Sequence, residues 1–370
     1  MSAWRVYVVP AGVLQSLMIG GGYGTGREIT EYFSRFGFSG GLLGLAVVAV
    51  CFAVLLILSF EFARLYHAYD YRRFFRALLG RGWIAFELMY LVMFSLVLAV
   101  VAAASASLVE EYLHWPGPVG IAILLLLVVL FAFYGRESVT RVLAYKALFL
   151  CAVFLTYFLV VLHRSSVLMG AQFSRHEILS GWAFAALRYT LYSSVVIPAM
   201  LFATTAIQTR RQAVISGMVC ALVAVVPAAL LHISFGAGYP QVLMHPIPLY
   251  WMVSSLNLPI LTVTYLAVLF GSLFDVGIGF VQSVNERLDG RSLERHGRPI
   301  TRTNRAAIAS LCVVSSGALS QLGIMALIAQ GYGTMAYGFL LFFVGPLLTI
   351  GVYRMARPPL RAIAGAIEEQ

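Results

Sequence analysis

A run of glycines followed at once by charged residues stands near the start of the chain. Five of the seven residues from 20 to 26 are glycine, and Arg27, Glu28 and Glu31 come soon after them. Each glycine costs roughly 1 kcal/mol relative to alanine inside a helix, so we expect a helix to break here. The unpaired N–H and C=O groups of a broken helix inside a membrane must line a polar cavity or be buried in protein. Such groups can bind a small solute.

The same glycines also fit a helix-packing motif. Gly20 with Gly24 and Gly22 with Gly26 both have G-x-x-x-G spacing. Packing alone does not explain the charged residues that follow at membrane depth. A phosphate-binding loop is disfavoured, because the spacings of both common glycine-rich motifs are missing and no strand precedes the run. We interpret the run as an interruption, with close packing as the alternative.

A second candidate interruption lies in the other half of the chain, where hydroxyl side chains precede a proline. Residues 189–198 contain Tyr192, Ser193 and Ser194 before Pro198. Proline removes a helical hydrogen bond and clashes with the preceding turn, while nearby hydroxyls can pair with the freed backbone groups. Alone, this pattern is typical of an ordinary membrane-helix kink. Interruptions at corresponding places in two halves, however, indicate an inverted-repeat transporter with a binding site at the membrane midplane.

Ionisable residues inside apolar runs are candidates for coupling transport to an ion gradient. Asp275 lies deep in one such run, where a charge costs at least roughly 2.5–3.5 kcal/mol, and Ser272 precedes it by one helical turn. We predict a sodium or proton site there; the alternative is a structural carboxylate paired with a neighbouring helix. Lys146 is a further candidate, but a static ion pair with Glu87 or extension of its side chain to the membrane surface explains it as well.

Opposite charges also fall near the two interruptions. Arg188 precedes the second one, and Arg27, Glu28 and Glu31 follow the first. Hydrogen bonds between these groups could open and close an outer gate. A permanently formed structural pair is the alternative.

Composition places all of these residues in a membrane protein. The 370 residues are 61% hydrophobic and 11% charged, whereas a soluble domain is typically about 45–50% apolar and about 25% charged. A water-soluble fold is therefore excluded. The four cysteines lie in apolar runs without C-x-x-C spacing, which disfavours disulfides and a zinc site. We find no catalytic triad, paired-histidine metal motif or phosphate motif, and expect neither an enzyme nor a cofactor beyond a possible sodium ion.

The apolar runs and the basic connectors between them predict the topology. Basic residues collect in alternate connectors and near both ends, which predicts that both termini are cytoplasmic in the cell membrane. The +10 formal charge is thus explained without a nucleic-acid partner, because acidic residues are interspersed and no stacking aromatics accompany the basic ones. About ten crossings are expected, near residues 6–35, 40–65, 83–109, 118–135, 142–162, 182–206, 212–235, 258–284, 305–322 and 332–353.

The stretch from Ile19 to Ile29, continuing to Tyr32-Phe33 and Phe36-Gly37, resembles the first helix of the YkvI-type membrane proteins. That family looks like a distant branch of the LeuT-fold transporters of amino acids, polyamines and organocations. The resemblance implies an all-α fold of two inverted five-helix repeats, at 1–165 and 180–355, with a cytoplasmic tail at 356–370. It also implies that helices 1 and 6 are broken and hold the substrate, and that a cation site lies between helices 1 and 8.

Carried over position by position, the resemblance implies which residues bind substrate. Lys146 resembles a helix-5 lysine that replaces sodium in some proton-coupled relatives, although it lies nearer the membrane edge. The substrate-binding set would be Gly20, Gly22, Tyr23, Gly24 and Thr25 at the first interruption, with Tyr192, Ser193 and Ser194 opposite.

The sequence therefore predicts a secondary transporter of a small polar or zwitterionic solute, such as an amino acid or an organic amine, driven by sodium or protons. A non-transporting membrane sensor on the same fold is one alternative. An intramembrane lipid-modifying enzyme is another, although the scattered acidic residues form no catalytic constellation.

Overall fold

The computed structural model describes residues 3–18, 21–134, 137–274, 276–277 and 301–357. The regular elements among them are all helical, as the composition predicts. Six helical segments are long and apolar enough to cross a membrane, and two further apolar helices, Gly117–Val128 and Pro259–Phe274, are shorter. A ten-helix 5+5 arrangement is therefore not established by these residues. The six are Phe38–Leu65, Tyr71–Leu113, Ala152–Ser174, Trp182–Thr204, Arg210–Gly238 and Gly323–Ala356.

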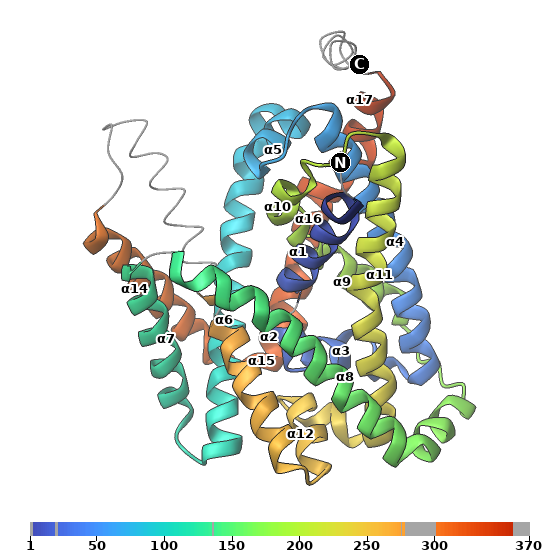
Figure 1. Cartoon of the computed structure of the whole chain (residues 1–370), viewed down its shortest axis with the longest axis vertical. Helices are drawn as coiled ribbons and strands as arrows, with labels where there is room; N and C mark the ends of the chain where they lie inside the picture. Colours follow the sequence, from blue (N-terminus) through green and yellow to red (C-terminus); the bar gives the residue numbers. More distant parts are fainter. Residues whose placement is uncertain (1–2, 19–20, 135–136, 275, 278–300, 358–370) are drawn as a thin grey trace.

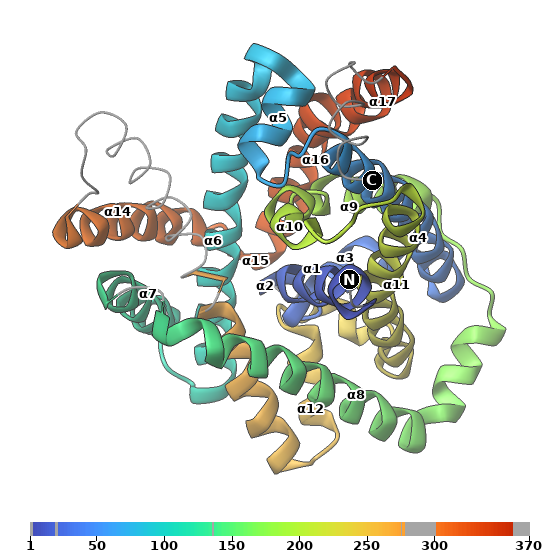
Figure 2. The same cartoon turned by 45° about the horizontal axis from the view of Figure 1, so that its top comes forward.

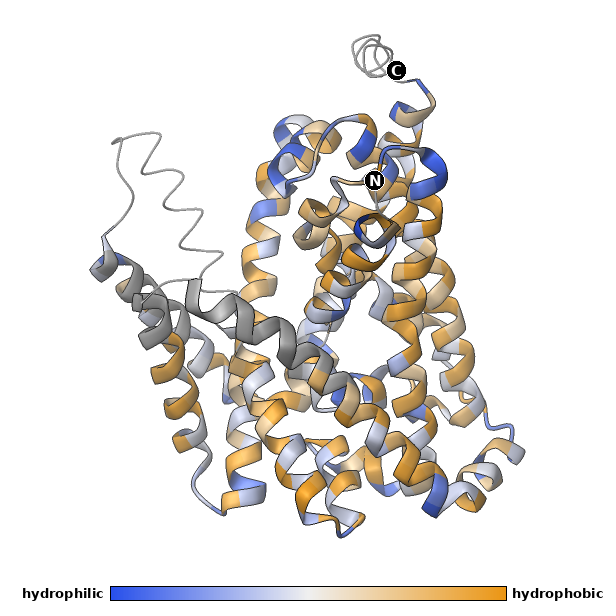
Figure 3. Ribbon diagram, viewed as in Figure 1, coloured by the Kyte–Doolittle hydropathy of each residue, from blue (hydrophilic) through white to orange (hydrophobic). Residues whose placement is uncertain are grey.

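Hydrophilic residues gather toward the two ends of the molecule, and the helices between them are mostly hydrophobic (Figure 3). Many large apolar side chains on the outside of the bundle are exposed, among them Val50, Leu88 and Ile260. In water so much exposed apolar surface is unfavourable, whereas lipid tails cover it at no cost. The surface is that of a membrane protein.

Two long helices, α4 (Phe38–Leu65) and α11 (Arg210–Phe235), pack closely along one side of the bundle (Figure 1). α11 starts with a capping box, in which Thr209 accepts from the Gln212 N–H and the Gln212 side chain accepts from the Thr209 N–H. Gly217 lies against the backbone of Ile57, since a Cβ there would be only 2.9 Å from the Ile57 nitrogen. A small residue thus allows two membrane helices to approach closely.

Further helices surround the centre. α6 (Trp83–Leu113) packs against α7 (Gly117–Tyr134) and α14 (Arg302–Ser320), and α8 (Glu137–Ser174) crosses the molecule obliquely (Figures 1 and 2). α8 extends beyond the predicted 142–162 and has a kink at Ser165, where φ is −130° and ψ is 19°. The short amphipathic α5 (Tyr71–Leu79) is capped at its N-terminus by Asp70, whose side chain accepts from the Arg73 N–H.

The last spanning segment, Gly323–Ala356, alternates α-helical and π-helical turns. π-helical turns are frequent at functional sites in proteins, and one of them, η7, faces the site described below. The elements are α15 (Gly323–Ala326), η7 (Leu327–Tyr332), α16 (Gly333–Phe339), η8 (Leu340–Val344), η9 (Leu347–Gly351) and α17 (Val352–Ala356).

The segments predicted to be interrupted lie inside this ring of helices (Figure 2). The first is divided into η1 (Trp4–Val8), α1 (Val9–Met18), α2 (Gly21–Gly24) and α3 (Arg27–Tyr32). The second is divided into α9 (Trp182–Ser193), α10 (Val196–Met200) and η4 (Leu201–Thr204). α3 contacts α9, and α1 contacts α10, so the two segments run beside each other.

Candidate functional site

The first interruption falls where the glycine run predicts it. α2 ends at Gly24 and α3 begins at Arg27, and Gly26 between them is in the left-handed region with φ at 79°. Side chains with a Cβ adopt that region at a cost of roughly 1–2 kcal/mol. A Cβ at Gly26 would also lie 2.7 Å from a ring carbon of Phe235 and 3.3 Å from the Leu249 nitrogen. Only glycine fits this turn without strain.

The carbonyl groups freed at the first interruption are taken up by specific donors. The Thr25 hydroxyl donates to the Gly22 carbonyl at 2.9 Å, and the Tyr265 hydroxyl donates to the Gly24 carbonyl at 3.1 Å. The Leu249 N–H donates to the Thr25 carbonyl at 3.0 Å.

Leu249 is the second residue of α12 (Pro248–Ser255), where helical N–H groups have no partner within their own helix. A carbonyl freed at the first interruption and an N–H group left unpaired at the start of α12 therefore form a hydrogen bond with each other. Gly22, Gly24 and Thr25 belong to the predicted substrate-binding set. In this conformation their carbonyl groups accept hydrogen bonds from the protein itself.

The second interruption is milder. Ser194 and Val195, between α9 and α10, keep right-handed helical dihedral angles. Pro198 has no N–H to donate to the Ser194 carbonyl four residues earlier. That carbonyl accepts instead from the Ile197 N–H at 3.0 Å, and the Ser194 hydroxyl donates to the Leu191 carbonyl at 2.6 Å. The result is one tight turn whose polar groups are paired locally.

A buried hydrogen bond joins the two interrupted segments. The Tyr192 hydroxyl on α9 donates to Oε2 of Glu28 on α3 at 2.8 Å, and both side chains are buried. The other carboxylate oxygen rests on Gly22, where a Cβ would come within 2.1 Å of Oε1. The absence of a side chain at Gly22 therefore leaves the room that the Glu28 carboxylate fills.

Four buried tyrosines gather around this carboxylate, and we call them the tyrosine cluster: Tyr32, Tyr189, Tyr192 and Tyr332. Ring centroids of neighbouring members lie 5.0–5.7 Å apart in tilted or edge-on arrangements, the spacing that aromatic pairs favour. Tyr192, which donates to Glu28, makes ring contacts with each of the other three members. The Tyr32 hydroxyl donates to the Ile328 carbonyl of η7 at 2.9 Å, which ties α3 to the last spanning segment.

The predicted gate residues divide into separate contacts. Arg27 pairs with Glu31 at 3.0 Å and donates to the Leu243 carbonyl at 2.8 Å, and Arg35 also pairs with Glu31. Arg188 instead donates to the Ala329 carbonyl of η7 at 3.3 Å. Within the described part of the chain, no ion pair connects Arg188 with an acidic residue.

The predicted coupling residues are described only in part. Ser272 is buried, and its hydroxyl donates to the Val268 carbonyl at 2.9 Å. Asp275 and Gly20 lie outside the described residues, and so does the side chain of Lys146, whose backbone belongs to α8. The described residues contain no group of three or more histidine, cysteine or acidic side chains that could hold a metal ion.

Sequence reasoning missed most of the tyrosine cluster. A signal existed for part of it, because Glu28 with Tyr32 and Tyr189 with Tyr192 have the spacing of neighbours on one helix face. Tyr332 of the cluster lies in a distant segment, and so does Tyr265, which donates to the Gly24 carbonyl. No local sequence pattern indicates either residue. Ser193, next to Tyr192 in the chain, is also buried.

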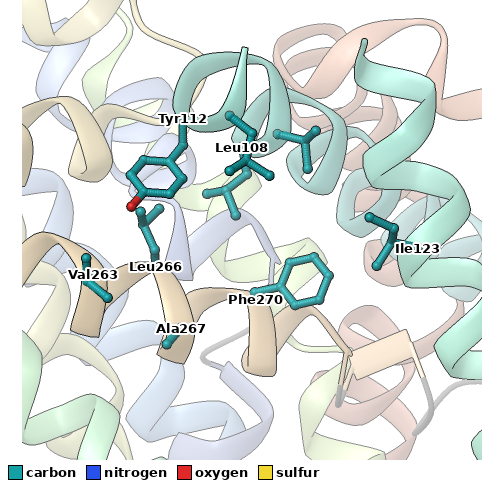
Figure 4. Close-up of a pocket in the computed structure, with 9 residues that line it drawn as sticks. Leu108, Tyr112, Ile123, Val263, Leu266, Ala267 and Phe270 are labelled. Atoms are coloured by element: carbon teal, nitrogen blue, oxygen red, sulfur yellow. The ribbon is translucent and has the colours of Figure 1, made fainter. Parts of the chain in front are cut away.

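A separate hollow lies away from the interruptions, between α6, α7 and the helix Pro259–Phe274 (Figure 4). Its volume is about 320 Å³ and its walls are almost entirely apolar; they include Leu108, Tyr112, Ile123, Leu266 and Phe270. None of the predicted site residues lines it. It lacks the convergent polar groups that fix a small polar solute.

The fold is shared with solved LeuT-fold transporters. A manganese transporter of Eremococcus coleocola, in complex with an aromatic bis-isothiourea substituted compound, superposes with a TM-score of 0.60 at 14% identity, over 93% of this chain and 78% of the other. A Na⁺-coupled sialic acid symporter in a substrate-bound outward-open state gives a TM-score of 0.60 at 12% identity, with the same coverage. At such identities the likeness shows the fold.

The resemblance predicted from the first helix is confirmed along nearly the whole chain. The chain is 24% identical over 352 residues, 90% of its own length and 92% of the other, to the uncharacterized membrane protein YkvI of Bacillus subtilis (strain 168). A comparison with protein-family profiles found no match.

Proposed function

We propose that the chain is a secondary active transporter of a small polar or zwitterionic solute, such as an amino acid or an organic amine, coupled to sodium or protons. The observation that carries this proposal is the interruption between α2 and α3, which lies inside the bundle beside the interruption after α9. A broken backbone at that depth requires polar partners. Two interrupted helices side by side are typical of transporters whose solute binds at the midplane.

The structural neighbours support transport in general terms. Their names record transport of manganese by one and Na⁺-coupled transport of sialic acid by the other. We place the solute of this chain between the first interruption and the face formed by Tyr192, Ser193 and Ser194. Solute entry then requires that Thr25, Tyr265 or Tyr192 release some of the groups they now contact.

The remaining assignments complete the proposal. Two inverted five-helix repeats span residues 1–165 and 180–355, and the termini face the cytoplasm. Asp275 binds the coupling ion with help from Ser272, and Lys146 is the second candidate for coupling. Opening on the outer side involves Arg27, Glu28, Glu31 and Arg188. Arg27, Glu28 and Arg188 connect α3 and α9 to other segments by polar contacts, and Glu31 holds Arg27 by an ion pair.

Uptake by the purified full-length chain in liposomes tests the proposal. We expect accumulation of a radiolabelled amino acid or amine under an imposed sodium or proton gradient, and none without a gradient. Asp275→Asn should abolish gradient-driven accumulation because it removes the charge that binds the ion. Asp289→Asn, in a predicted basic connector, serves as the matched control.

Two outcomes would defeat parts of this proposal. Solute binding without uptake under any gradient would favour the membrane sensor over the transporter. Full gradient-driven accumulation by Asp275→Asn would remove Asp275 from the coupling site.

A further inference from the structure

We propose that the hollow between α6, α7 and the helix Pro259–Phe274 binds one acyl chain of a membrane phospholipid, which packs against the helix that carries Tyr265. The hollow is separate from the place proposed for the solute, and lipid binding can be measured without transport. Failure of this inference therefore leaves the proposed function unchanged, and failure of transport leaves the lipid site unchanged.

The first argument is the chemistry of the walls. Among the described residues that line the hollow, the Tyr112 hydroxyl is the one polar side-chain group, and the other side chains are hydrocarbon. A polar solute would lose its water there without gaining hydrogen-bond partners. Apolar cavities of this kind stay dry. The space of about 320 Å³ therefore suits an apolar occupant.

The hollow is continuous with the surface that faces lipid. Val263 is 53% exposed and Tyr112 is 43% exposed, although both line the hollow. Leu108 and Leu266 line it too but are only 7% exposed each, so they form its inner wall (Figure 4). Exposed apolar side chains of a membrane helix lie against acyl chains. A chain at this surface can enter the hollow without crossing a polar barrier.

Aromatic residues mark the level of the lipid head groups. The hollow borders the last turns of α6, near the α6–α7 connection, which lies at the end of the molecule opposite α17 (Figure 1). Trp115 in that connection and Tyr112 are both exposed, and such rings typically lie at the head-group level. Leu108 lies about 6 Å further along α6, at 1.5 Å per residue. That is where the acyl chains begin.

The hollow fits a flexible chain better than a second protein helix. Membrane helices usually meet through glycine, alanine, serine or threonine, whereas these walls carry branched and aromatic side chains. Ala267 is the one small residue among the described residues of the lining. A helix with its side chains is roughly 10–12 Å across, which is too wide for this space. We therefore assign the hollow to an acyl chain.

The walls on α6 and α7 are held together by specific contacts. The Ser105 hydroxyl donates to the Gly120 carbonyl at 2.9 Å, and the Glu110 carboxylate accepts from the Gly117 N–H at 2.9 Å. A Cβ at Gly120 would collide with the Ser105 carbonyl oxygen, so the two helices already touch there. Closing the hollow by sliding α7 along α6 would break these contacts, whereas an acyl chain fills the space without breaking them.

Two of the walls also border the first interruption. The helix Pro259–Phe274 carries Tyr265, whose hydroxyl donates to the Gly24 carbonyl at 3.1 Å. The ring of Tyr112 lies edge-on at 6.4 Å from the ring of Tyr250, and its neighbour Leu249 is the other distant donor to that interruption. An empty space beside a helix forfeits packing contacts. A bound chain should therefore stabilise the segments that hold both donors.

Photo-cross-linking of the purified full-length chain tests the inference. The probe is a phosphatidylcholine with a diazirine at the end of one acyl chain, in nanodiscs of unlabelled phosphatidylcholine. We expect label on Leu108 or Leu266, mapped by peptide mass spectrometry, because their burial keeps them from general contact with lipid. Absence of label there, with label on exposed residues such as Val50 and Ile260, overturns the inference without any variant.

A matched pair of variants tests whether the chain occupies this space. Ala267 lines the hollow at an exposed position, so Ala267→Phe adds a ring to the hollow without entering a packed core. It should lose the label on Leu108 and Leu266. Ala46→Phe, at an exposed position of α4, should keep that label. Label that persists on the inner wall of a folded Ala267→Phe variant contradicts the site.

Thermal unfolding in detergent tests the stabilising role of the chain. Added phosphatidylcholine should raise the unfolding temperature of the wild type and of Ala46→Phe, and should raise that of Ala267→Phe less. Equal shifts in the three proteins would contradict packing of the chain against the helix that carries Tyr265. A disulfide-linked dimer of Val263→Cys, together with no label on the inner wall, would assign the hollow to a second copy of the chain instead.

Discussion

The two interruptions of the central helices differ in their backbone conformation and in the groups that bond to their freed carbonyls. The first has a left-handed residue, Gly26, and its carbonyls are bonded to groups from distant segments, Tyr265 and Leu249. The second keeps helical dihedral angles at Ser194 and Val195 and pairs its polar groups within one turn. The polar groups of the second are thus paired locally beside Pro198, whereas those of the first are paired by segments that only the folded protein brings near.

This difference indicates where movement is costly. Straightening the first interruption would break contacts to α12 and to the helix Pro259–Phe274 at once, because both supply its donors. Bending at the second changes only local hydrogen bonds. We therefore expect the first interruption to act as a fixed platform and the α9–α10 turn to change more readily during transport.

Gly26→Ala should have the largest effect. The substitution forces a Cβ into the left-handed region and against Phe235 and Leu249, so we expect a loss of about 2–5 kcal/mol in the free energy of unfolding. Denaturant unfolding in detergent measures it. Gly12→Ala, at a position on α1 with no atom within 4 Å of the added carbon, should change stability by less than about 1 kcal/mol. Similar losses of unfolding free energy in Gly26→Ala and Gly12→Ala would contradict the expectation that the first interruption stays fixed during transport.

Arg27→Ala should come next in size. The side chain is nearly buried and connects Glu31 with the Leu243 carbonyl, so its removal should cost about 1.5–3 kcal/mol. Arg35→Ala removes the other partner of Glu31, but that side chain is 53% exposed and its contribution should be below about 1 kcal/mol. Thermal unfolding of the two variants measures the contrast. Equal costs would mean that Arg27 does not anchor α3.

The Tyr192–Glu28 bond can be isolated by a double-mutant cycle. Unfolding free energies of the wild type, Glu28→Gln, Tyr192→Phe and the double variant should give a coupling of about 1–3 kcal/mol, because the bond is short and buried. The same cycle on Glu87 and Tyr71, whose oxygens are 3.4 Å apart, should give a smaller value. Additive effects at Glu28 and Tyr192 would show that the two interrupted segments are not coupled through this contact.

Pro198→Ala should have the smallest effect on stability. Pro198 is the third residue of α10, where a helix leaves its N–H groups unpaired, so its missing donor costs little. We expect a change within about 1 kcal/mol together with slower uptake, because a straighter helix no longer turns at Ser194. Unchanged uptake in liposomes would remove the second interruption from the transport cycle.

Sequence patterns located the first interruption closely, because the cost of five glycines in a helix is a local property. The helical membrane class followed equally directly from composition. The number of membrane crossings did not follow as directly. About ten are predicted, whereas the described residues contain six long apolar spans, in part because the first segment is divided into short helices. Of the tyrosine cluster, Tyr192 alone was predicted, as a substrate contact.

Composition and glycine spacing by themselves determined that this chain is a membrane protein with a break near its start, because transfer free energy and backbone entropy belong to each residue wherever it lies. The tertiary structure alone decided that Glu28 contacts Tyr192, that Arg188 contacts Ala329 and that Leu249 satisfies Thr25. Those partners are far apart along the chain, and only the packing of helices brings their polar groups within hydrogen-bonding distance.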